Sequence, residues 1–198
     1  MTPRIRKSSK FPASLSRLRY NTLMSTKSGQ LQGHRFHGDP KRFPAVAGFV
    51  FNRFGHTIKY IADVAGGRGM LTRILNKKYG YSAEVVDPRG WTLKGVPARE
   101  EKFAPDMADY YDLIIGLHPD EATRAVALTA KIRPTILIPC CNFWDRSRKL
   151  GREALLAQIS AFYKSHKVNY ETITFDFAGP KNIGLVTTLP KLSSTSKK

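Results

Sequence analysis

Three glycines fall within four residues, at Gly66, Gly67 and Gly69, between two apolar segments. Glycine lacks a Cβ, so such a run lets the backbone turn sharply and come close to another chain segment or to a ligand. The preceding apolar run has the pattern of a strand, and the following run has helical periodicity. A strand, a glycine-rich turn and a helix in this order are typical of α/β proteins whose ligand lies at the turn.

The same alternation of strand and helix patterns continues along the chain. Pro44 is expected at the first position of a helix that ends at Gly55. Alternation of this kind predicts a mostly parallel sheet with helices on both faces, and two successive strands at the end predict an antiparallel pair. The expected strands are 57–64, 82–87, 110–117, 135–141, 170–177 and 182–189, and the expected helices after the first are 70–79, 121–132 and 148–166.

The glycine run excludes two common nucleotide-binding loops. A phosphate-binding loop of the Walker type needs G-x-x-x-x-G-K-[ST], and the sequence contains no such run. A dinucleotide fingerprint needs G-x-G-x-x-G/A, but counting from Gly67 and Gly69 places Thr72 at the third position. What remains is an acid followed by small residues at alternate positions: Asp63, Ala65, Gly67 and Gly69.

This remaining pattern resembles the first motif of class I S-adenosylmethionine-dependent methyltransferases, D/E-x-G-x-G-x-G, with Ala65 in place of the first glycine. Asp87 follows at the end of the second expected strand, where a carboxylate can accept hydrogen bonds from both ribose hydroxyls. The resemblance implies a Rossmann-like three-layer sandwich and S-adenosyl-L-methionine as cofactor. The residues that it implies for cofactor binding are Asp63, Ala65, Gly66, Gly67, Gly69, Asp87, Pro88 and Leu117.

The segment after the strand at 110–117 carries the candidate catalytic residues. His118, Ala122 and Thr123 are similar to the H-x-C-G-x-A-T motif of a branch that includes tRNA 2′-O-methyltransferases, and Cys140-Cys141 is similar to a C-C dipeptide of that branch. His118 is the candidate general base, with Asp120 as its partner or that of a substrate base. Each has a structural alternative: a histidine that shapes the pocket, and an acid in the first turn of a helix.

The two neighbouring cysteines allow more than one role. Cys141 is a candidate nucleophile, because RNA 5-methylcytosine enzymes attack the base with a cysteine at this strand end. The alternative is that both cysteines are small residues lining the substrate pocket. Adjacent cysteines do not supply a CxxC pair and no second ligand pair is present, so no metal site is expected.

Aromatic and basic residues are interleaved directly after the cysteines. Phe143 or Trp144 could stack on a base while the neighbouring cations hold phosphates; alternatively, the aromatic residue covers the edge of the core. With the basic start of the chain, the candidate substrate-binding residues are Asn142, Phe143, Trp144, Arg146, Arg148, Lys149, Arg4, Arg6 and Lys7.

The chain is strongly basic, with a formal net charge of +18 over 198 residues. Residues 1–43 contain ten Lys or Arg and one acid, so half of the net charge lies in this segment. Such a segment favours polyanions, with nucleic acid the first candidate partner, although a solvated tail is the alternative. We expect a basic N-terminal arm at 1–43, a methyltransferase domain at 44–190 and a disordered tail at 191–198.

These features predict an enzyme that methylates RNA, either tRNA or rRNA. The alternatives are a methyltransferase of a protein or small molecule, and a degenerate basic RNA-binding module. No membrane span is expected, because no apolar run approaches about 18 residues. The expected location is cytoplasmic. Mitochondrial or plastid targeting is the alternative, because the first 38 residues lack acids and contain six serines.

Overall fold

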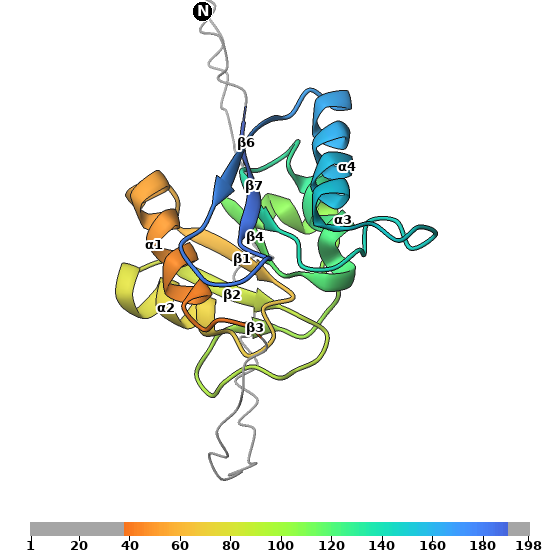
Figure 1. The fold of residues 1–198 in the computed structure, drawn as a ribbon. Coiled ribbons are helices and arrows are strands. Elements are labelled where there is room, and N and C mark those ends of the chain that lie inside the picture. Colours follow the sequence, from red (N-terminus) through yellow and green to blue (C-terminus); the bar gives the residue numbers. More distant parts are fainter. Residues whose placement is uncertain (1–37, 190–198) are drawn as a thin grey trace, which may run out of the picture.

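The computed structural model describes residues 38–189, which form a seven-stranded sheet covered by helices on both faces (Figure 1). The strand order is β3-β2-β1-β4-β5-β7-β6. Neighbouring strands from β3 to β5 are parallel, whereas β7 runs antiparallel to β5 and β6. The predicted mostly parallel sheet with an antiparallel C-terminal pair is therefore confirmed. The strands are β1 (Tyr60–Val64), β2 (Ser82–Val86), β3 (Ala98–Arg99), β4 (Leu113–Leu117), β5 (Thr135–Ile138), β6 (Asn169–Thr174) and β7 (Ile183–Thr188).

The helices lie in two layers, as Figure 1 shows: α1 and α2 on one face of the sheet, α3 and α4 on the other. Successive strand residues face opposite layers, because side chains alternate along a strand. Ile61 of β1 belongs to the buried cluster that contains Val50 of α1 and Leu75 of α2, whereas its neighbour Ala62 belongs to the cluster that contains Ile159 of α4. The helices are α1 (Arg42–Phe54), α2 (Met70–Tyr79), α3 (Thr123–Thr129) and α4 (Arg152–Ser165), with short 3-10 turns at Gly55–Thr57, Pro105–Tyr110 and Asp120–Ala122.

Several predicted boundaries differ from the structure. Helix α1 begins at Arg42, so Pro44 is its third residue rather than its first. Strand β5 ends at Ile138, because Pro139 has no N–H to continue the ladder. Helix α4 begins at Arg152 rather than Arg148, since the segment before it folds as a loop around Asp145. The short strand β3 and the 3-10 turn at Pro105–Tyr110 were not predicted.

The segment before α1 packs against the folded domain. In residues 38–41, the carboxylate of Asp39 accepts a hydrogen bond from the N–H of Ala178, which lies between β6 and β7. Arg42 and Phe43 are buried. The folded region therefore begins before Pro44 and includes part of what the sequence assigns to the basic arm. Arg4, Arg6 and Lys7 lie outside the described residues.

Candidate active site

The ends of β1, β2, β4 and β5 meet at one edge of the sheet, because parallel strands bring their carboxyl ends to the same side. A cavity of about 720 Å³ opens at this edge. Its walls come from the glycine loop after β1, the segments after β2, β4 and β5, the residues preceding and beginning α1, and the connection between β6 and β7. The cavity is lined by residues 38–39, 42–43, 65–68, 117–118, 120, 140–141 and 177–181 and by Met70, Arg89 and Trp91.

Asp63 stabilises the glycine loop through buried hydrogen bonds to the start of α2. Its buried carboxylate accepts hydrogen bonds from Thr72 Oγ1 at 2.8 Å and from the N–H of Thr72 at 3.3 Å. A Cβ on Gly66 would lie 2.6 Å from this carboxylate, so only glycine fits there. Burial raises the pKa of Asp63 to about 6, against the opposing effect of the Thr72 hydrogen bonds. Asp63 therefore positions the loop and does not itself line the cavity.

Two other loop positions have left-handed backbone conformations. Ala65 has φ of 54°, which costs energy for a residue with a Cβ. Gly69 has φ of 73°, and a Cβ there would lie 2.6 Å from Val96 Cγ1. Of the predicted cofactor-binding residues, Ala65, Gly66, Gly67 and Leu117 line the cavity. Gly69, Asp87 and Pro88 do not, and Gly69 instead packs the loop against Val85 and Val96.

Asp87 is buried behind the side chain of Arg89. Its Oδ1 accepts from the N–H and Nε of Arg89, at 3.0 Å and 2.9 Å. Its Oδ2 accepts from the N–H of Gly67 at 2.9 Å and from Arg89 Nη2 at 2.6 Å. Although burial raises the pKa of Asp87, these hydrogen bonds outweigh burial and hold it below its ordinary value. Arg89 also stacks on Trp91, with Cζ 5.0 Å from the ring centroid.

His118 lies at the end of β4, with φ of 58°, and lines the cavity. Its Nε2 lies 2.9 Å from the carbonyl oxygen of Lys181. A carbonyl can only accept, so Nε2 carries the hydrogen, and in the neutral ring Nδ1 keeps the lone pair. Burial is the main cause of a pKa below the ordinary histidine value, and the charge of Arg42 contributes. His118 is therefore neutral at pH 7, with Nδ1 able to accept a proton.

Asp120, Cys140 and Cys141 form a cluster beside His118, with one potential ligand atom from each residue within 4.8 Å of the others. The thiol of Cys140 donates to Asp120 Oδ1 at 3.2 Å. Burial and the neighbouring carboxylate raise the pKa of Cys140, so this thiol stays protonated. Lys181 Nζ lies 3.5 Å from Cys141 Sγ. The positive charge of this ammonium is unfavourable for a cation bound at the cluster.

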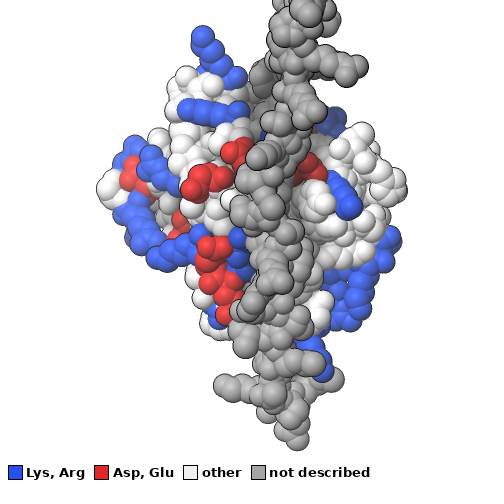
Figure 2. Space-filling view, turned by 180° about the vertical axis from the view of Figure 1, so that it is seen from behind, with Lys and Arg blue, Asp and Glu red and all other residues white. Residues whose placement is uncertain are grey.

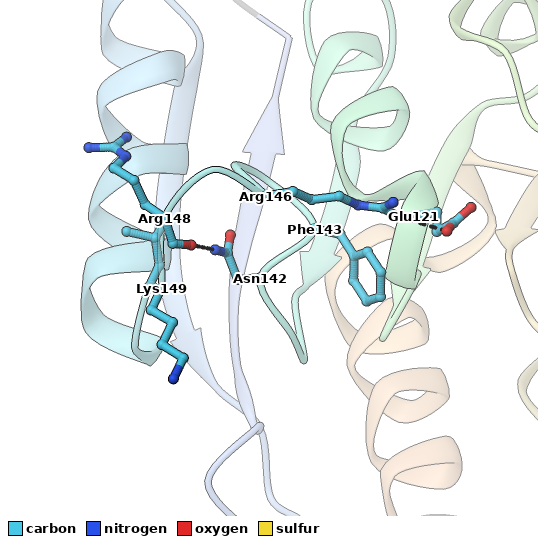
Figure 3. Close-up of a pocket in the computed structure, with 7 residues that line it drawn as sticks. Glu121, Asn142, Phe143, Arg146, Arg148 and Lys149 are labelled. Carbon is cyan, nitrogen blue, oxygen red and sulfur yellow. Dashed lines mark hydrogen bonds and ion pairs between the residues drawn. The ribbon is translucent and has the colours of Figure 1, made fainter.

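The predicted substrate-binding residues after β5, with the exception of Trp144, line a second, open depression of about 520 Å³ (Figure 3). Arg146 points toward Glu121, with Nη2 2.7 Å from Oε1, and its Cζ lies 5.2 Å from the Phe143 ring centroid. Asn142 has a structural task, because its amide donates to the carbonyl oxygens of Asp145 and Arg148. The lining residues are Glu121, Asn142, Phe143, Arg146, Arg148, Lys149 and Leu150.

Trp144 does not line this depression. Its side chain is buried in the core layer under α4, with the ring centroid 5.3 Å from that of Phe162. Arg124 lies against the ring, with Cζ 5.1 Å from the centroid. A buried ring is not available to stack on a base. The prediction of Trp144 as a substrate-binding residue is therefore corrected to the alternative of a core aromatic.

Some residues of the site were not predicted from the sequence. Arg89 and Trp91 follow Asp87 closely, and a search around that acid would have found them. The sequence shows Thr72 only as the residue that breaks the dinucleotide fingerprint. In the structure its hydroxyl donates a hydrogen bond to the carboxylate of Asp63. Arg42 and residues 177–181 are far from the motifs in sequence, and only the fold brings them to the cavity.

Within residues 38–189, no helix is both long enough and apolar enough to span a bilayer.

Comparisons with known proteins identify the fold. No protein-family model matches the chain. No curated protein matches it in sequence. Among solved structures, similar chains include a Streptococcus thermophilus protein described as a hemolysin (TM-score 0.54, 14% identity, 79% of this chain and 68% of that chain). DesVI of Streptomyces venezuelae is similar with TM-score 0.50 and 13% identity, covering 76% of this chain and 91% of that chain.

A third similar structure is the methyltransferase domain of the bacterial Hen1 protein CtHen1-CN. It has a TM-score of 0.50 and 13% identity, and the alignment covers 75% of this chain and 98% of that chain. The described chain therefore has a Rossmann-like methyltransferase fold.

Proposed function

We propose that this protein is an S-adenosylmethionine-dependent methyltransferase whose acceptor is RNA. The observation that carries the proposal is the cavity between the glycine loop and the ends of β4 and β5, together with the carboxylate of Asp87, which is buried behind the cavity-lining residue Arg89. In α/β sheets of this kind, ligands bind at the carboxyl ends of the strands. A glycine-rich loop without a lysine suits a nucleoside that carries no phosphate.

The residues present fit this cofactor. Gly66 and Gly67 line the cavity, so a ligand can lie directly against the backbone. Asp87 is the acceptor for a ribose diol once the side chain of Arg89 moves away. The volume of about 720 Å³ lies in the range of small-molecule sites. When bound, the cofactor supplies an activated methyl group and its own leaving group.

The chain's own residues then act mainly by positioning. By holding the acceptor beside the cofactor, these residues would remove from the reaction step the entropic cost of bringing two molecules together. Nδ1 of His118 is the atom that would take the proton from an acceptor hydroxyl or amine, since Nε2 is committed to Lys181. The connection 177–181 lies along the cavity and limits the access of water.

An RNA acceptor is supported by charge. The net charge is +18, and half of it lies in residues 1–43. The depression next to the cavity carries Arg146, Arg148 and Lys149, which suit phosphates. On the face in Figure 2, lysine and arginine side chains are spread around the margin rather than gathered in one patch. The arm and the depression are therefore the parts that we propose for RNA binding.

Calorimetric titration with S-adenosylmethionine tests the cofactor, and tritium transfer to total RNA tests the acceptor. We expect micromolar binding that Asp87→Ala abolishes. The matched control is Asp109→Ala, since Asp109 is an exposed acid that pairs with Arg133 away from the cavity. Absence of binding at millimolar cofactor would overturn the proposed enzyme and favour a basic RNA-binding module.

Removal of residues 1–37 separates the possible acceptors. With an RNA acceptor, transfer to RNA falls strongly without these residues, while cofactor binding is unchanged. Transfer to protein or to small molecules in an extract, with none to RNA, would contradict the proposed acceptor.

A further inference from the structure

Arg42 is a buried cation in the cavity wall. Only 9% of the residue is exposed, and it lines the same cavity as the glycine loop and His118. Its Nη1 donates to the carbonyl oxygen of Asp39 at 3.0 Å, and its Cζ lies 4.3 Å from the Phe43 ring centroid. Within residues 38–189 it forms no ion pair with a carboxylate, unlike Arg89 and Arg146.

Asp39, the acid nearest to Arg42 in sequence, already accepts hydrogen bonds from two backbone N–H groups. Asp39 accepts hydrogen bonds from the N–H of Lys41 at 2.9 Å and from the N–H of Ala178 at 2.8 Å. Its carboxylate therefore fastens the 38–41 segment to the β6–β7 connection instead of neutralising Arg42. Burial lowers the pKa of Arg42 from its ordinary value, and the charge of Asp39 offsets this only in part.

The position of Arg42 in its helix makes the electrostatic environment of its positive charge less favourable still. Arg42 is the first residue of the 13-residue helix α1, whose first turn contains no acid. The N-terminus of a helix carries partial positive charge, so a cation there is unfavourable and an anion is favoured. A buried guanidinium is normally paired, because desolvating an unpaired charge is costly. Both features favour an anionic ligand group at this end of the cavity.

We propose that Arg42 binds the carboxylate of the amino-acid part of the cofactor. The inference rests on the proposed function, and it assigns complementary groups to the two parts of one ligand. Asp87 accepts from the ribose hydroxyls, and Arg42 donates to the carboxylate. A guanidinium presents two parallel N–H donors to a carboxylate, which fixes the orientation of the group as well as binding it.

Two ligands that differ in the amino-acid part test this assignment. S-adenosylhomocysteine carries the carboxylate, whereas 5′-methylthioadenosine keeps the nucleoside and sulfur but lacks the amino acid. We expect Arg42→Gln to weaken S-adenosylhomocysteine binding by about 10- to 100-fold, the size expected for hydrogen bonds to a charged group. Binding of 5′-methylthioadenosine should be unchanged, and Arg42→Lys should lie between wild type and Arg42→Gln.

Arg73→Gln is the matched control, because Arg73 is an exposed arginine of α2 that does not line the cavity and forms no ion pair within residues 38–189. It should leave both affinities unchanged. Unaltered binding of 5′-methylthioadenosine also shows that the Arg42→Gln variant has folded.

Equal weakening of both ligands, or no weakening of S-adenosylhomocysteine, would overturn the role of Arg42 while leaving the proposed cofactor intact. Loss of RNA binding with unchanged S-adenosylhomocysteine binding would assign Arg42 to a phosphate instead. If neither ligand binds the wild-type protein, the proposed function fails, and this inference fails with it.

Discussion

Arg89 contacts both carboxylate oxygens of Asp87, with Nε 2.9 Å from Oδ1 and Nη2 2.6 Å from Oδ2. Each oxygen also accepts one backbone N–H, from Arg89 and from Gly67 respectively. An ionised carboxylate has about four acceptor positions, so Asp87 is saturated. Displacing the Arg89 side chain frees one position on each oxygen, and a vicinal diol has two hydroxyls to fill them. Arg89 thus competes with the proposed ligand.

Replacing Arg89 by methionine should strengthen nucleoside binding. We expect S-adenosylhomocysteine affinity to rise by about 2- to 10-fold, since one net hydrogen bond is worth about 0.5–1.5 kcal/mol. Arg73→Met is the control and should change little, because Arg73 is an exposed residue of α2 outside the cavity. Calorimetry measures both variants, and weaker binding by Arg89→Met would show that Arg89 contacts the ligand directly.

The raised pKa of Asp63 predicts a pH-dependent stability. The folded-state pKa is about 6 against the ordinary 3.8, so the folded protein holds a proton that the unfolded chain releases between these values. The stabilisation is complete below pH 3.8 and is lost as pH rises through 6. Relative to Asp63→Asn, the free energy of unfolding of the wild type should fall by about 3 kcal/mol across this window.

Urea unfolding of the wild type and Asp63→Asn at pH 4.5 and 7.5 should show about 2 kcal/mol of this difference, because pH 4.5 already lies above 3.8. Parallel changes in the two proteins would show that Asp63 does not titrate in this range.

Ala65 lies in the left-handed region with φ of 54°, so Ala65→Gly should stabilise the protein by about 1 kcal/mol. Gly67 has nearly the same φ, 55°, and its Cβ would meet only Arg89 Nη2, at 3.9 Å. Gly67→Ala should therefore cost about the same amount. Thermal unfolding checks both, and a destabilised Ala65→Gly would mean that the alanine methyl group makes contacts that outweigh the strain.

The depression after β5 should contribute to the salt dependence of RNA binding. Replacing Arg146, Arg148 and Lys149 by glutamine should reduce the slope of log K against log salt by about 0.7 for each phosphate that the protein no longer neutralises. Arg146 and Arg148 pair with Glu121 and Asp145, so we expect the full effect only for Lys149. The same change at Arg73, Lys77 and Lys78 of α2 is the control, and equal effects of the two triples would contradict a specific role of the depression.

Trp144 is expected to support the core and not the substrate. Trp144→Ala should cost about 3–5 kcal/mol of stability, because it removes a buried aromatic side chain. The milder Trp144→Phe should fold and bind RNA with unchanged affinity, whereas Phe143→Ala should weaken binding with little loss of stability. If Trp144→Phe bound RNA more weakly while keeping the stability of the wild type, Trp144 would have to contact the RNA after all.

The sequence predicts features that depend on local pattern. The glycine loop, the C′ position of Gly80 and the alternation of strands and helices follow from spacing and backbone requirements, and the structure agrees with them. Residues whose role depends on tertiary contacts are not predictable in this way. Sequence position alone assigns Arg42 to the basic arm, because nothing in its sequence neighbours reveals that the chain folds back beside residues 177–181.

Strand ends are also less predictable than strands. The sequence pattern places Cys140 and Cys141 at a strand end, but Pro139 ends the ladder and leaves them in a loop. Trp144 is ambiguous in sequence, since an aromatic residue among cations fits both a surface and a core edge. The packing of Phe162 against it resolves the ambiguity, and that contact links residues of two separate elements.

Because β7 lies between β5 and β6, the C-terminal part of the sheet can form only after β7 has been synthesised. Both neighbouring strands are synthesised before β7. In the described sheet β6 is an edge strand that pairs only with β7. Until residues 183–188 emerge, β5 is an open edge with the sequence TILI, which is the kind of surface that captures strands of other chains. The 177–181 wall of the cavity also comes late. A nascent chain therefore passes through a stage in which one edge of β5 is unpaired and the wall of the cavity is incomplete.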